Sequence, residues 1–169
     1  MKGSITGILF ALLAFVSVTC GKVTFNMSGA SIGNAKTCQV GYFENRADIV
    51  IPSLSAQMTD ALKDKIQSSS SLRLVNNNAD VIFEGEITGY NIQPQQITPA
   101  TGRPAQDRLT ITVKVKFTNM LESDKSYDKS FSRFQEAPSG SISSNADQLA
   151  GLILEELMED IYNEAFANW

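Results

Sequence analysis

Residues 108–118 read Arg-Leu-Thr-Ile-Thr-Val-Lys-Val-Lys-Phe-Thr, an uninterrupted alternation of apolar and polar side chains. Apolar residues occupy every odd position from Leu109 to Phe117, and the even positions carry arginine, threonine or lysine. Because successive side chains of a strand point to opposite faces, this pattern predicts a β-strand with one face buried and one in solvent. A sheet with two such different faces is covered on one side only.

A second stretch, Asp80–Tyr90, has the matching pattern. One face carries apolar residues and a glycine, namely Val81, Phe83, Gly85 and Ile87. The other face carries two acids and a threonine, namely Glu84, Glu86 and Thr88. If the two stretches pair antiparallel, Glu84 and Glu86 can lie across from Lys114 and Lys116. Each opposite-charge pair would contribute roughly a few tenths of a kcal/mol.

Shorter patterns predict the rest of the sheet. Tyr127–Phe134 is a further strand, and Thr37–Glu44 and Asp48–Ile51 are short extended pieces interrupted by the turn-like residues 44–46. Between the two long strands, Gln93–Asp107 holds three of the five prolines and shows no periodicity. This predicts a long irregular connection, of the kind that is often functional or mobile.

Two helices are expected. Leu54, Met58, Leu62 and Ile66 recur every four residues, which predicts one apolar stripe from Ser53 to about Gln67. A second helix has a Ser144-x-x-Asp147 capping pattern before a wide apolar stripe. The chain is therefore predicted to form one α+β domain over residues 20–169, with two helices on one face of a mixed or antiparallel sheet of about four strands.

The second helix is acidic, and no lysine or arginine follows Arg133 in the chain. Two interpretations stay open for its six acids: a solvated face that opposes aggregation, or a surface for a basic partner. These acids are Asp147, Glu155, Glu156, Glu159, Asp160 and Glu164.

The N-terminus has the pattern of an export signal. Lys2 precedes a nearly unbroken apolar run from Ile5 to Val18, which is too short to span a bilayer. Cys20 follows this run directly, as in bacterial lipoproteins, so residues 1–19 are predicted to be a lipoprotein signal peptide and Cys20 the lipidation site. Alternatively, Cys20 is merely a residue near a cleavage site.

The second cysteine, Cys38, lies in an apolar-alternating stretch and is predicted to be a small buried hydrophobe. A Cys20–Cys38 disulfide is the competing interpretation, because exported proteins meet an oxidising compartment. Removing residues 1–19 leaves 13 basic and 18 acidic side chains, a formal charge of −5.

Composition excludes several kinds of site. The 169 residues contain no histidine and only two cysteines, which excludes histidine-based nucleophile systems, histidine metal ligands and an all-thiolate zinc site. We expect no cofactor. The net charge of −4 argues against nucleic-acid binding, which depends on a basic surface.

Several segments together resemble the Bacteroidota-type lipopolysaccharide-assembly lipoproteins of the LptE family. The resemblance lies in the order and spacing of segments with no catalytic signature: Cys20-Gly21, Phe25–Ile32, Tyr42–Asn45, Pro52–Ser55, Ala61–Asp64, Phe83–Tyr90, Arg108–Asn119, Phe131–Phe134 and Asn163–Trp169. It implies a lipid-anchored protein on the periplasmic side of the outer membrane. It also implies association with the LptD β-barrel, partly as a plug, and help in delivering lipopolysaccharide to the cell surface.

Two candidate surfaces follow. Arg108, Lys114, Lys116 and, near them, Arg133 are candidate contacts for the anionic groups of lipopolysaccharide, unless they simply pair with Glu84 and Glu86. The Gln93–Asp107 connection is a candidate partner loop, unless it is a disordered connector. Its marker residues are Pro94, Pro99, Gly102 and Pro104.

Two other function classes compete with the assembly lipoprotein. One is an anchored periplasmic ligand-binding or carrier module with a pocket under the helices and no barrel partner. The other is an enzyme that uses Glu84 and Glu86 as paired carboxylates. The enzyme is the weakest candidate, because facing lysines would keep these carboxyls from the raised pKa that a general acid requires.

Overall fold

A computed structural model describes residues 32–97 and 104–167. The predicted signal peptide, Cys20, Pro99 and Gly102 lie outside the described residues. In chain order the elements are β1 (Thr37–Val40), β2 (Glu44–Asn45), α2 (Pro52–Ser69), β3 (Arg73–Leu74), β4 (Val81–Ile97), β5 (Pro104–Asn119), the 3-10 turn η1 (Ser123–Lys125), β6 (Tyr127–Pro138) and α3 (Ile142–Phe166).

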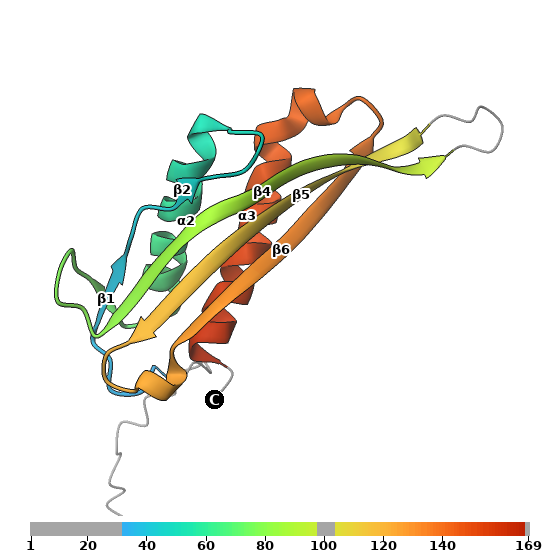
Figure 1. The fold of residues 1–169 in the computed structure, drawn as a ribbon. Coiled ribbons are helices and arrows are strands. Elements are labelled where there is room, and N and C mark those ends of the chain that lie inside the picture. The colour runs from blue at the N-terminus through green and yellow to red at the C-terminus, as the bar shows by residue number, and fades with distance from the viewer. Residues whose placement is uncertain (1–31, 98–103, 168–169) are drawn as a thin grey trace, which may run out of the picture.

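These elements form a two-layer α+β domain, as predicted. The strands make one mixed sheet in the order β3-β1-β4-β5-β6, with β2 pairing separately with β4. Both helices pack on the same face of the sheet (Figure 1). The sheet has six strands instead of about four, because β2 and β3 are two residues long and too short to show any periodicity.

The predicted register of the two long strands is confirmed. Glu84 pairs with Lys116 and Glu86 with Lys114 in the antiparallel β4–β5 ladder. A bulge between Ile87 and Gly89 then shifts the alternation of β4 by one residue. Because of this shift, Tyr90 joins the buried face and is only 4% exposed.

The prediction of an irregular connection from Gln93 to Asp107 is wrong over most of its length. β4 continues to Ile97 and β5 begins at Pro104, and their ladder includes Gln93↔Arg108 and Pro94↔Asp107. Backbone pairing in a hairpin needs no apolar alternation, so the pattern could not reveal it. Among the described strands, none pairs with β4 on its other side beyond Ile87, and proline is tolerated at such an edge.

Three local predictions also need correction. The turn-like residues Glu44-Asn45 form β2, because their backbone pairs in parallel with Glu86 and Ile87 of β4. Residues 48–51 form bends and irregular backbone instead of a strand. Helix α3 begins at Ile142. The Ser144 hydroxyl donates to the Ser141 carbonyl oxygen at 2.8 Å and does not cap the helix by accepting from the backbone N–H of Asp147.

The space between the helices and the sheet is filled by aromatic rings. The ring centroids of Phe83 and Phe117 are 4.8 Å apart, and Phe166 of α3 lies 6.0 and 5.8 Å from them. Cys38 is a free thiol with no exposed surface, which confirms the prediction of a buried hydrophobe. Burial raises the pKa of this thiol to about 12.

Candidate functional site

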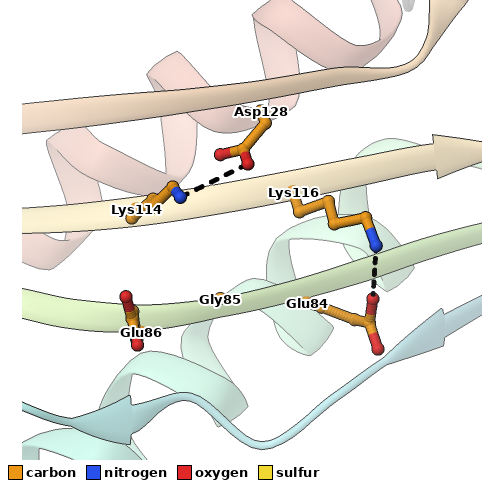
Figure 2. A pocket seen from close by; sticks show the side chains of 6 residues that line it. All are labelled: Glu84, Gly85, Glu86, Lys114, Lys116 and Asp128. Atoms are coloured by element: carbon orange, nitrogen blue, oxygen red, sulfur yellow. Dashed lines mark ion pairs between the residues drawn. The ribbon is translucent and has the colours of Figure 1, made fainter.

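The face of the sheet opposite the helices is open and carries three of the four cations that the sequence singled out. The side chains of Arg108, Lys114 and Lys116 alternate with the buried side chains of β5 and therefore project from this open face. The two lysines are 48% and 59% exposed. Figure 2 shows both lysine side chains on the viewer's side of the strands, with the helices behind the sheet.

Lys114 and Lys116 border a shallow depression of about 250 Å³ (Figure 2). Its other lining residues are Glu84, Gly85, Glu86 and Asp128, so three carboxylates face two lysines. Lys116 Nζ lies 3.6 Å from Glu84 Oε2, as the register predicts. Lys114 Nζ instead lies 3.3 Å from Asp128 Oδ2 of β6.

Glu86 has a different partner from the one its register suggests. Its Oε2 is 3.1 Å from Nε of Arg46, whose Nη2 also lies 3.0 Å from Glu44 Oε2. The open face is therefore a network of opposite charges that spans β2, β4, β5 and β6. Such exposed pairs contribute only about 0–1 kcal/mol each, so an anionic ligand could exchange for the carboxylates at low cost.

Arg108 lies farther along the same face, in a different environment. Its Nη2 is 2.7 Å from Glu136 Oε1, and its guanidinium lies over the Phe134 ring at 4.0 Å from the centroid. Phe134 is 47% exposed. Between Arg108 and the lysines the face is neutral, and the hydroxyls of Thr112 and Ser132 are hydrogen-bonded at 3.0 Å.

The structure does not bring Arg133 together with the other three cations. Arg133 projects from the helix side of β6, where its Nε and Nη2 donate to the two carboxylate oxygens of Asp160 at 2.6 and 2.7 Å. The carboxylate holds the pKa of Arg133 above its ordinary value, mainly through this hydrogen bond.

The acids of α3 are largely satisfied within the molecule, which neither interpretation of the sequence anticipated. Lys65 of α2 pairs with Glu159, and Lys129 of β6 pairs with Glu164. Gln135 donates to Glu156 at 2.7 Å. Cations placed far away in the sequence thus pair with three of the six acids of α3, and only the packing of β6 and α2 against α3 reveals it.

Sequence reasoning missed Phe43, which supports the site from below. Its ring is fully buried against Gly85, where an added Cβ would lie 2.5 Å from the ring and 2.4 Å from the Lys114 carbonyl oxygen. The Phe43 amide donates to Thr59 Oγ1 of α2 at 3.1 Å. The glycine in the Phe-Glu-Gly-Glu segment was the available signal, because a glycine within a strand often marks such a close approach.

On the open face, Glu84 and Glu86 do not form a pair of carboxylates suited to acid-base catalysis. Glu84 and Glu86 each face a cation, and their side chains are 59% and 34% exposed. Within residues 32–97 and 104–167, no group of three or more acidic or cysteine side chains could hold a metal ion. No helix in the part of the chain that the structure describes has the length and apolar character needed to span a membrane.

Comparison with known proteins identifies relatives of this architecture. The model of a family described as LptE: Lipopolysaccharide-assembly matches residues 35–165. Several solved structures share the fold, among them three lipoproteins. A minor lipoprotein from Acinetobacter baumannii has a TM-score of 0.53 and 13% identity, and the match covers 79% of this chain and 94% of that chain. An uncharacterized lipoprotein B from Nitrosomonas europaea has a TM-score of 0.52 and 10% identity, with 76% of this chain and 80% of that chain covered. The rare lipoprotein B from Shewanella oneidensis has a TM-score of 0.50 and 10% identity, with 73% of this chain and 89% of that chain covered. A comparison with curated protein sequences finds no match.

Proposed function

The chain belongs to the LptE lipopolysaccharide-assembly family, and on that premise we propose that it is an outer-membrane lipoprotein that associates with an LptD-type β-barrel and assists the insertion of lipopolysaccharide. Cys20 carries the lipid anchor in this proposal, and the domain works on the periplasmic side. The observation that supports it most is the family match over residues 35–165, which covers every described strand, all of α2 and all of α3 except its last residue, Phe166.

The open sheet face is the proposed contact for lipopolysaccharide. Its phosphates would replace Glu84 and Asp128 as the partners of Lys116 and Lys114, while Arg108 offers a further cation beside the exposed Phe134 ring. Arg133 is the weakest of the four candidates, because it is already bound by Asp160 on the other side of the sheet.

The far half of the β4–β5 hairpin is the proposed contact for the barrel. It extends beyond both helices (Figure 1), and its described tip includes Pro94 and Pro104. A lumen of polar side chains suits the polar residues of this hairpin. A carrier with a pocket under the helices has less support, because the rings of Phe83, Phe117 and Phe166 fill that space.

Co-purification tests the barrel partnership. The full-length chain, extracted from membranes in detergent, should bring down a stoichiometric LptD-type barrel. Replacing residues 98–103 by Asn-Gly, which favours a tight turn between two strands, should reduce the yield of barrel while the melting temperature stays unchanged. A wild-type yield from this variant would remove residues 98–103 from the proposed contact.

Charge reversal tests the lipopolysaccharide contact. Lys114→Glu with Lys116→Glu should lower the amount of lipopolysaccharide retained by the purified protein several-fold. The matched control is Lys63→Glu, a cation on α2 whose exposed pair with Asp60 lies away from the open face. Equal retention by the double variant and the control would contradict the contact.

A further inference from the structure

A groove of about 570 Å³ runs between α2 and α3, on the helix layer and away from the open sheet face. One wall comes from α2 and the other from α3. The lining residues are Gln57, Asp60, Ala61, Asp64 and Lys65 of the first helix and Gly151, Leu154, Glu155, Met158 and Glu159 of the second.

The floor of this groove is apolar and unfilled at one point. Ala61, Leu154 and Met158 supply apolar surface, and Gly151 interrupts the middle of α3. A Cβ at Gly151 would meet no atom within 4 Å, so nothing in the described structure requires a glycine there. Glycine costs a helix interior about 1 kcal/mol relative to alanine, and here its effect is to leave space for a close approach from outside.

The walls of the groove carry excess negative charge. Four of the ten lining residues are acids and one is a cation, Lys65, which pairs with Glu159. Asp64 and Glu155, on opposite walls, are exposed and have no ion-pair partner among the residues that the structure describes.

The sheet side of α3 is closer to balance, because among the described residues only Glu156 there has a neutral partner, Gln135. On the sheet side of the same helix, Arg133 binds Asp160 and Lys129 binds Glu164. The acids that line the groove are spaced along two walls, and the described residues contain no group that could hold a metal ion. The arrangement therefore matches several separate cations better than a single ion.

We propose that this groove binds a segment of a partner protein that carries two or more lysine or arginine side chains beside small apolar ones. The apolar floor receives the small side chains near Gly151, and the cations lie against Asp64 and Glu155. The proposal rests on the proposed function, in which the chain works as part of a protein assembly.

Photo-crosslinking in cells tests the proposal with the full-length anchored chain. The photoreactive amino acid p-benzoylphenylalanine is placed at Gly151 or, in a second variant, at the half-buried Gln57. Irradiation should yield a protein adduct, and mass spectrometry should locate the crosslink in a segment of net positive charge. Asp64→Lys with Glu155→Lys should lower the adduct yield at least about tenfold, because like charges then face each other.

The matched control reverses two acids outside the groove, Asp147→Lys with Asp124→Lys, and should leave the yield unchanged. Reversing the mapped lysines or arginines of the partner to glutamate should restore the adduct with the variant that carries Asp64→Lys and Glu155→Lys. Circular dichroism of each variant verifies the fold. Three outcomes overturn the proposal: no adduct from either position, an adduct in a neutral or acidic segment, or a yield that charge reversal leaves intact.

The same cells separate this proposal from the proposed function. If the barrel co-purifies normally while positions 57 and 151 give no adduct, the groove proposal fails and the assembly role stands. If the barrel is absent but a cationic segment of another protein is crosslinked, the groove proposal stands and the barrel partnership fails.

Discussion

The guanidinium of Arg133 and the carboxylate of Asp160 form a two-pronged hydrogen-bonded pair, with N–O distances of 2.6 and 2.7 Å. The pair joins the edge strand β6 to α3 across 27 residues of sequence. It holds the acidic helix against the sheet at a point where both side chains are partly exposed.

Exchanging the charges of this pair tests its role. Arg133→Asp or Asp160→Arg alone should lower the melting temperature, because each places like charges in contact. The double exchange should recover most of that loss, since the pair is restored in reverse. Thermal melts at low and high salt measure the effect, and it should shrink at high salt. Additive losses in the double variant would show that the two side chains do not interact.

Two glycine-to-alanine substitutions should change the free energy of unfolding in opposite directions. Gly85→Ala should lower the free energy of unfolding by about 1–3 kcal/mol, because its Cβ would lie 2.4 Å from a backbone oxygen. Gly151→Ala should raise the free energy of unfolding by about 1 kcal/mol, because alanine favours the helix more than glycine does. The added Cβ would have no atom within 4 Å. Urea unfolding of both variants measures this. The same sign for both would contradict the packing described at Gly85 or the open space at Gly151.

Phe43 and its neighbour Tyr42 offer a matched pair of aromatic substitutions. Phe43 is fully buried, so Phe43→Ala should cost about 3–5 kcal/mol of stability. Tyr42 is 63% exposed, and Tyr42→Ala should change stability by no more than about 0.5 kcal/mol. Denaturant titration distinguishes the two, and comparable losses would contradict the burial of Phe43.

Asp80 should make the fold acid-sensitive. Its carboxylate accepts hydrogen bonds from the amide of Lys36 and from the amide and hydroxyl of Thr37. These bonds hold the pKa of Asp80 below its ordinary 3.8, and the bond from the Lys36 amide has the largest effect. Because the folded-state pKa is lowered, the stabilisation is fully present above pH 3.8 and is lost as the pH falls through the folded-state value.

Comparison with Asp80→Asn isolates this contribution. The wild type should be more stable than the variant at pH 6, and the difference should narrow as the pH falls from about 4 toward about 2. Urea unfolding at each pH provides the measurement. A difference that stays constant over this range would show that the Asp80 charge has no role.

Cys38 should react with thiol reagents only when the protein unfolds. It has no exposed surface, and burial raises its pKa to about 12, so the thiol stays protonated at pH 8. Iodoacetamide at pH 8 should leave Cys38 unmodified in native protein and modify it quickly in urea, as measured by mass spectrometry. Rapid modification of native Cys38 would contradict the burial.

Some features of this protein were readable from the sequence alone. The alternation of residues 108–118 and of Val81, Phe83 and Ile87 determined two strands, each with one buried face, because side-chain period is a local property. The same alternation put Glu84 and Lys116 on solvent faces that could meet, and the antiparallel pairing brought them opposite each other. The recurrence of Leu54, Met58, Leu62 and Ile66 determined α2 in the same way.

Other features depend on backbone pairing or on contacts between distant segments, and these only the tertiary structure decided. Backbone hydrogen bonds form β2, and they also extend β4 and β5 through Pro94 and Asp107. Such bonds leave no pattern in the side chains. The bulge after Ile87 reversed the faces of β4, and Arg133 came to Asp160 instead of joining Lys114. Charge and hydrophobicity are properties of single residues, so the sequence shows which side chains are charged. Which charged side chains form a pair depends on the elements that pack together, and here the packing of α3 on β6 decides it.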